Sequence, residues 1–145
     1  MKSKNFWITV IVIFLVCLAY EFLVHGYILN NQYYKNLTPS LFLSMNGAER
    51  QLGWLFRSAI FIAEFIASFF FVLIYSRGVE GKGWLGEGFR YGFLIWGVAV
   101  LAPTVGMYSF SKYPGKLLLW WIVYGLIEMV ILGWVCAALY KKPAQ

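Results

Sequence analysis

The sequence predicts an all-α integral membrane protein, in which four transmembrane helices form an antiparallel bundle and a short interfacial helix joins the first two. Of the 145 residues, 61% are apolar and 12% are charged, whereas an average soluble domain carries roughly 25% charged residues. The apolar residues form four blocks, each long enough for the roughly 20 residues that cross a bilayer core. Short polar joints separate the blocks, so one transmembrane domain is expected over residues 1–145.

Lysine and arginine give the chain a formal net charge of +6. They stand singly or in pairs near the ends of the apolar blocks, which is the pattern that orients helices and meets anionic lipid headgroups. The charge therefore predicts a lipid-bilayer partner and argues against nucleic acid. Seven basic residues fall on the side of both termini and five on the other, so the termini are predicted to be cytoplasmic. The seven are Lys2, Lys4, Arg77, Lys82, Arg90, Lys141 and Lys142, and the five are Lys35, Arg50, Arg57, Lys112 and Lys116.

The first helix is predicted over residues 6–29. Lys2 and Lys4 ahead of an apolar run are typical of a signal peptide, but this run is too long for one and no small-residue cleavage site follows it. We therefore expect the helix to stay in the mature protein. In the polar joint that follows, Thr38 is a good N-cap and Pro39 suits a first helical position, which predicts the short interfacial helix.

The second helix is predicted over residues 54–76, and a turn rich in glycine and charge follows it. The third is predicted over residues 84–110. Small residues spaced along it let helices approach closely, which predicts a central position in the bundle, and Pro103 predicts a kink. The fourth is predicted over residues 117–140. Cys17 and Cys136 lie inside spans at different depths, so we interpret them as small apolar residues without a disulfide.

Part of the second half resembles a known family. The residues that carry the resemblance are Gly92-Phe93, Trp96-Gly97, Ala102-Pro103, Tyr108-Ser109-Phe110, Pro114, Lys116-Leu117 and Tyr124. Over about residues 85–138, the chain resembles an uncharacterised family of small four-helix bacterial membrane proteins, known as a domain of unknown function. In that family an Asn and a Glu usually stand where this chain has Met107 and Ser111. The resemblance implies a four-helix fold and a bacterial inner-membrane location, and it implies no activity.

Ionisable residues within the predicted spans are the candidate site. Moving such a group into hydrocarbon costs at least about 2.5 kcal/mol, so it marks a functional site by default. The helical rise of about 1.5 Å per residue places Glu64 and Glu128 near mid-membrane, Glu21 roughly 10 Å below the outer face, and His25 and Arg57 near that face. Glu21 and His25 share a helix face, as do Arg57 and Glu64.

Three interpretations of this polar set stay open. The carboxyl groups could hold helices together, protonated or paired, as in an accessory subunit of a larger membrane complex or a homodimer. They could instead form a cavity or conduit for protons, a cation or a small polar solute, with Glu21 and His25 at its mouth and Glu64 and Glu128 at its floor. Finally, Glu21 and His25 could bind a metal, although di-iron bundles use Glu-x-x-His spacing on two helices.

The sequence favours a non-enzymatic role that needs no cofactor. It contains no Ser/His/Asp set and no Cys-x-x-Cys pair. The glycines of Gly81-x-Gly83-x-x-Gly86 match a nucleotide-binding pattern, but they lack the strand–turn–helix setting that gives the pattern its meaning. We therefore predict a small transporter-like or ligand-binding membrane protein, with the accessory subunit as the alternative.

Overall fold

The computed structural model describes residues 4–33, 53–81 and 83–140. Every regular element in these ranges is a helix, and four helical segments are long and apolar enough to cross a membrane. They are Lys4–Leu29, Ser58–Arg77, Trp84–Phe110 and Gly115–Leu139. The all-helical class and the four candidate spans are therefore confirmed for this part of the chain. The interfacial helix predicted to follow Thr38 lies outside the described residues.

The first segment is a continuous helix with a change of type near its middle. It is built from α1 (Lys4–Glu21), the π-helical η1 (Phe22–Leu29) and the short α2 (Asn30–Gln32). Neither glycine nor proline occurs between Lys4 and His25, so nothing in this stretch interrupts the backbone hydrogen bonds. π-Helical turns are rare in proteins, and those that occur are often found at functional sites. Here the π-helical stretch begins directly after Glu21 and contains His25.

The second segment, α4 (Gly53–Arg77), ends where the glycine-rich turn was predicted. The Gly78 N–H donates to the carbonyl oxygens of Ile74 at 3.1 Å and Tyr75 at 3.0 Å, which closes the last turn of the helix. Gly81 has a φ of 78°, a conformation that costs little only without a Cβ atom. This turn reverses the chain and leads it into the third segment.

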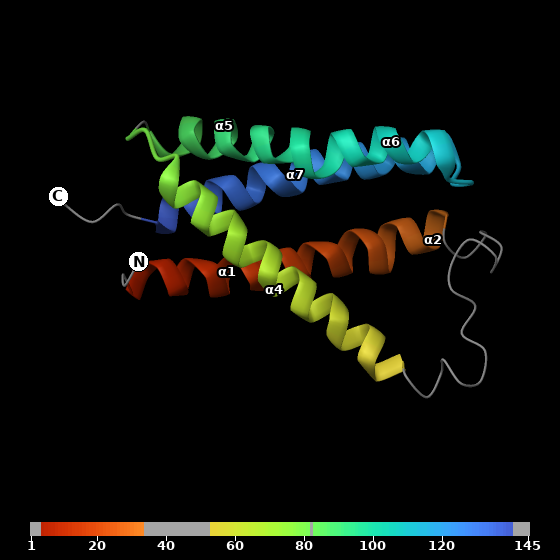
Figure 1. The fold of residues 1–145 in the computed structure, drawn as a ribbon, viewed down its shortest axis with the longest axis horizontal. Coiled ribbons are helices and arrows are strands. Elements are labelled where there is room, and N and C mark those ends of the chain that lie inside the picture. The colour runs from red at the N-terminus through yellow and green to blue at the C-terminus, as the bar shows by residue number, and fades with distance from the viewer. Residues whose placement is uncertain (1–3, 34–52, 82, 141–145) are drawn as a thin grey trace.

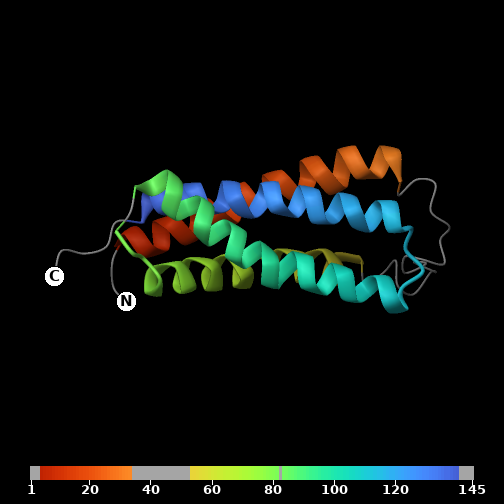
Figure 2. The same cartoon turned by 90° about the horizontal axis from the view of Figure 1, so that it is seen from above.

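The third segment runs through Pro103 without ending. It is built from α5 (Trp84–Trp96), the π-helical η4 (Gly97–Leu101) and α6 (Ala102–Phe110). Proline cannot donate a backbone hydrogen bond, and the helix widens into η4 immediately before it, where the Ala102 N–H bonds to the Gly97 carbonyl. Where the sequence predicts a kink, the structure has a π-helical turn directly before Pro103, and Figures 1 and 2 show the three stretches as one segment.

The fourth segment, α7 (Gly115–Leu139), is the helix that contacts most of the others. It packs against α1, α5, η4 and α6. The central position predicted for the third segment is therefore wrong: only 6% of its apolar window is buried, against 22–33% in the other three segments. The small residues of the third segment form one close contact with α7. The rest of the surface of this segment is mostly exposed.

That close contact depends on three glycines. A Cβ atom added to Gly88 would lie 2.8 Å from the Gly133 carbonyl oxygen, and one added to Gly92 would collide with the Met129 carbonyl oxygen. A Cβ atom on Gly133 would in turn meet the Gly88 carbonyl oxygen. The backbones of α5 and α7 thus touch directly, as small residues allow between membrane helices.

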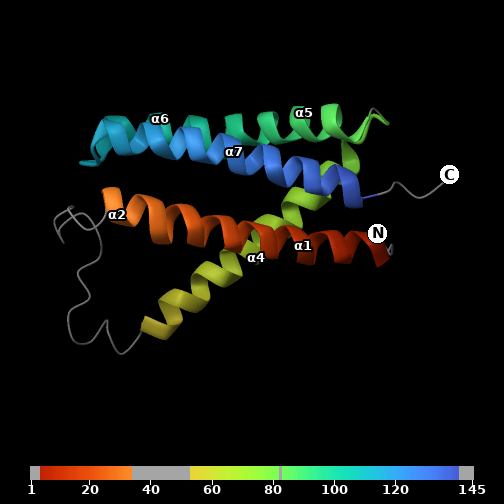
Figure 3. The same cartoon turned by 180° about the vertical axis from the view of Figure 1, so that it is seen from behind.

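The four segments do not pack evenly. Figure 1 shows α4 crossing α1 at an angle, with its first turns diverging from the other helices. Figure 3 shows the same divergence from behind, with the first half of α4 on the far side of α1 from α7. α1 begins and α7 ends at the same end of the molecule, as Figures 1 and 2 show.

Two clusters of buried side chains lie at different heights along the helices. One contains Phe6, Val10, Ile13, Cys17, Phe71, Val72, Tyr75, Tyr91, Leu132 and Cys136. The other contains Val24, Leu29 and Leu117, covered by the partly buried aromatic residues Tyr20, Tyr33, Tyr113, Trp120, Trp121 and Tyr124. On α1 the first cluster ends at Cys17 and the second begins near Tyr20. The candidate site lies at the level between them.

Candidate functional site

Cys17 and Glu21 place the first helix in the site. They are four residues apart at the end of α1, so their side chains share one face of the helix. Cys17 is 7% exposed, and the Glu21 side chain is 37% exposed. One more turn along, His25 Nε2 lies 3.6 Å from Glu21 Oε2. That distance suits an ion pair when the imidazole is protonated and is too long for a hydrogen bond.

Glu64 comes from α4, and its main chain is tied to the next turn of the same helix. The Ser68 hydroxyl donates to the Glu64 carbonyl oxygen at 2.7 Å. This bond uses the hydroxyl proton within α4, so Ser68 is not a donor to the Glu64 carboxyl group. The Glu64 carboxyl group is instead directed toward α1.

Glu128 comes from α7 and is 6% exposed. Cys17 lies between it and Glu64: Cys17 Sγ is 2.9 Å from Glu64 Oε2 and 3.3 Å from Glu128 Oε1. A thiol has one proton to donate and is a weak donor, whereas two carboxyl oxygens accept here. At any moment the thiol therefore satisfies one of the two carboxyl groups.

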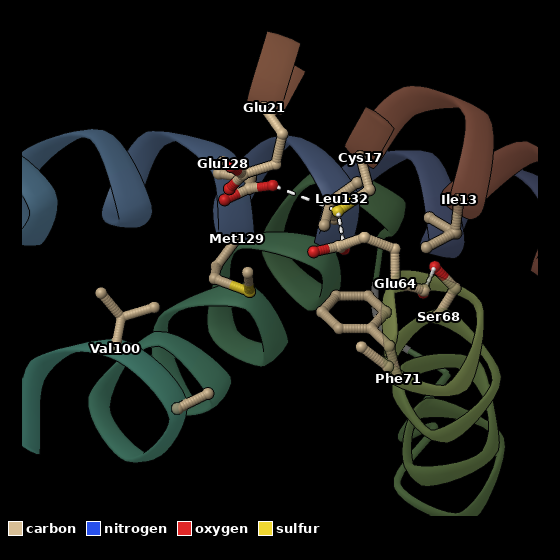
Figure 4. A pocket seen from close by; sticks show the side chains of 12 residues that line it. Ile13, Cys17, Glu21, Glu64, Ser68, Phe71, Val100, Glu128, Met129 and Leu132 are labelled. Atoms are coloured by element: carbon tan, nitrogen blue, oxygen red, sulfur yellow. Dashed lines mark hydrogen bonds between the residues drawn. The ribbon is translucent and has the colours of Figure 1, made fainter. Parts of the chain in front are cut away.

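The three glutamates line one cavity of about 240 Å³. Its lining comes from α1, α4, η4 and α7 and consists of Ile13, Cys17, Glu21, Glu64, Ala67, Ser68, Phe71, Ala99, Val100, Glu128, Met129 and Leu132. Figure 4 shows the three carboxyl side chains directed toward the same space, with the Cys17 sulfur between two of them. The described lining contains carboxyl groups and no lysine, arginine or histidine.

This charge pattern limits what the cavity can hold. Several carboxylates that share an enclosed site repel one another, and ionised groups away from water are costly. The negative charge of these carboxylates is neutralised only when protons or a positively charged group lie in the cavity with them. The cavity thus suits a proton, a cation or a solute that donates hydrogen bonds.

The structure brings together Glu21, Glu64 and Glu128 from the predicted set, and it places His25 beside Glu21, outside the cavity lining. Arg57 belongs to α4, but its side chain lies outside the described part of the chain. Glu21 and His25 are also the weak metal candidates of the sequence. Among the described residues, no three His, Cys, Asp or Glu side chains are grouped so that they could hold one metal ion.

Cys17 is the site residue that sequence reasoning missed. Its apolar interpretation is incomplete, because the thiol contacts two carboxyl groups. One signal could have revealed it: Cys17 stands four residues before Glu21, one turn earlier on the same face. Cys136 matches the apolar interpretation, since it is fully buried within the first cluster, and both cysteines are free.

A second buried carboxyl group, that of Glu87, lies outside the cavity. It is 2% exposed and accepts a hydrogen bond of 2.5 Å from the Glu80 N–H. Arg90 pairs with the Glu80 carboxylate at 3.0 Å and donates to the Gly78 carbonyl at 3.0 Å. These contacts fix the turn between α4 and α5, which assigns Glu87 to the fold and not to the site.

No family model matches the chain, and neither the curated proteins nor the solved structures contain a match. The resemblance of residues 85–138 to a family of small four-helix bacterial membrane proteins therefore stays a prediction. The function has to be argued from the site itself.

Proposed function

We propose that this chain is a multi-pass membrane protein whose central cavity binds and transfers a proton, a cation or a small polar solute. The observation that carries the proposal is that Glu21, Glu64 and Glu128, from three different helices, line one cavity. Intramembrane carboxyl groups that face a common space are typical of ion pathways and proton relays. The chain offers three of them at the level between its two buried clusters.

The membrane setting is part of this proposal. We place the four segments as an antiparallel bundle in a bacterial inner membrane, with both termini in the cytoplasm. Two observations support this placement: the four segments are long and apolar enough to span a bilayer, and basic residues are more numerous on the side of the termini.

Helix packing alone explains the site less well. Buried carboxyl groups that serve packing are expected to pair with basic side chains or with several hydrogen-bond donors. Here the donor between Glu64 and Glu128 is a single thiol, and the described cavity lining contains no basic side chain. The balancing charge is then supplied by what the cavity binds. His25 lies at one edge of this site, 3.6 Å from Glu21, and is partly exposed.

The test compares Glu64→Gln and Glu128→Gln with the wild-type chain in proteoliposomes. Uptake of protons and of methylammonium is expected to fall by about tenfold or more in both variants, as the loss of a hydrogen bond to a charged group produces. Glu80→Gln is the matched control, because it removes a carboxylate that lies in the turn and is 44% exposed. Circular dichroism should show the same helix content for all variants. If both cavity variants transfer protons and methylammonium as the wild type does, the carboxyl groups serve packing.

The uncovered surface of the third segment supports a second candidate, an accessory subunit of a larger membrane complex. Its large apolar residues are mostly exposed, and a Cβ atom on Gly97 or Gly106 would meet nothing within 4 Å. Small residues on an open helix face allow another helix to approach. Purification in a mild detergent should then recover a stoichiometric larger partner. A monomer or homodimer by light scattering would exclude this candidate.

A further inference from the structure

The polar cavity borders an apolar groove on the side of the molecule. The groove has a volume of about 300 Å³ and lies between α4 and the third segment, with Met129 of α7 at its inner wall. Four residues line both spaces: Ala67, Phe71, Ala99 and Met129. The remaining groove residues are Phe70, Ile74, Ile95 and Val98, so its described lining has no polar side chain.

Two of the four shared residues have small side chains. Ala67 on α4 and Ala99 on η4 lie at the junction, and both are exposed. Beyond them the groove opens sideways, since Phe70, Ile74 and Val98 are 52%, 50% and 76% exposed. Along the helices, the cavity borders the first buried cluster, which supplies Ile13, Cys17, Phe71 and Leu132 to its lining. The shared edge of the two spaces combines two alanines with Phe71 and Met129.

We infer that the site takes an amphipathic cation, an ammonium group on an aliphatic chain, which enters sideways from the bilayer. The inference rests on the proposed function for its head-group site and adds the class of ligand. The ammonium head lies among Glu21, Glu64 and Glu128, and the chain occupies the groove. Charge complementarity selects the head, because the described cavity lining carries carboxyl groups and no basic residue.

The ammonium head also suits a set of acceptors. An ammonium group donates three hydrogen bonds and accepts none, and at least two of the three carboxyl groups are without the single Cys17 proton at any moment. An aliphatic chain concentrates the ligand in the bilayer, because each buried CH2 group favours its transfer from water into lipid, and the transfer of the chain from lipid into the apolar groove is nearly neutral. Selectivity for the ligand then comes from the head and from access through the alanine junction.

The experiment measures protection of the buried carboxyl groups in nanodiscs. Dicyclohexylcarbodiimide, an apolar reagent, modifies protonated carboxyl groups, and mass spectrometry reports the adducts on Glu64 and Glu128. The probes are n-decylammonium, methylammonium and, as an uncharged control, n-decanol. In the wild-type chain, n-decylammonium is expected to protect both residues, methylammonium to protect them at higher concentration, and n-decanol to give no protection.

Three alanine variants separate the lateral route from general effects of added bulk. Ala67→Leu and Ala99→Leu narrow the junction and are expected to raise the n-decylammonium concentration for half-protection by about tenfold or more, the equivalent of at least 1.4 kcal/mol, and to raise that of methylammonium by less. Ala63→Leu is the matched control, because Ala63 is an exposed alanine one turn earlier on α4 that lines neither space. It should behave as the wild type.

The other outcomes of the labelling experiment distinguish failure of the ligand class from failure of the proposed function. Equal protection by n-decylammonium in all variants, or equal protection by n-decanol, would overturn the amphipathic cation and leave the proposed function standing. Protection by methylammonium at the same concentrations as n-decylammonium would do the same. Failure of both ammonium probes to protect, or no labelling of the wild-type carboxyl groups, would overturn the proposed function together with the inference.

Discussion

Substitution of Gly92 tests the close contact between α5 and α7. A Cβ atom at this position would collide with the Met129 carbonyl oxygen and lie 2.8 Å from the Val130 Cα atom. Both obstacles are main-chain atoms, so no side-chain rotation relieves them, and overpacking of this kind costs typically about 1–3 kcal/mol. Alanine recovers at most about 1 kcal/mol of helix propensity. We expect Gly92→Ala to destabilise the protein by about 1–2 kcal/mol.

Thermal unfolding in a mild detergent measures this change. For a chain near this size, about 1–2 kcal/mol corresponds to a Tm lowered by roughly 3–8 °C. Gly106→Ala is the matched control, since it lies in α6 and an added Cβ atom there meets nothing within 4 Å. It should raise the Tm by about 1–4 °C through helix propensity alone. Equal Tm shifts in the same direction for both variants would refute the described contact between α5 and α7.

Three further predictions follow from other contacts. Tyr91→Phe removes the hydroxyl that donates to the α4 main chain, and we expect a loss of about 0.5–1.5 kcal/mol in the free energy of unfolding; an unchanged Tm would contradict that bond. Glu87→Gln replaces a buried hydrogen-bond acceptor of the turn and should lower the Tm. Glu80→Gln breaks a partly exposed ion pair and should change the free energy of unfolding by at most about 1 kcal/mol. Cys136 is fully buried, free and outside the cavity lining, so N-ethylmaleimide should leave it unmodified in the folded protein and modify it in dodecyl sulfate, as measured by mass spectrometry.

The helical class and the four candidate spans could be predicted because they depend on length and composition. Each apolar block is close to the length that a bilayer requires, and the turn at Gly78 and Gly81 was marked by glycine and charge. The helix limits differ by only one or two residues from the predicted ones at most ends, because polar joints end the blocks sharply.

The convergence of the carboxyl groups could not be predicted, because it depends on the rotation of each helix about its axis. Spans that are apolar nearly all round carry no periodic signal for that rotation. The central position predicted for the third segment is wrong because its glycines indicate a close contact on one face only. Gly88 and Gly92 both meet α7 on that face. The contact of Cys17 with two carboxyl groups depends on the same rotation.

The two π-helical stretches bear on how related chains should be aligned with this one. A π-helical turn closes with an i→i+5 bond where an α-helical turn closes with i→i+4, so it accommodates one extra residue while the helix continues. Relatives that lack η1 or η4 would then carry a single-residue gap in the middle of a span, opposite residues 22–29 or 97–101. An alignment that forbids gaps within membrane spans would shift the residues between such a point and the end of that span by one position, and in the third segment this includes Pro103.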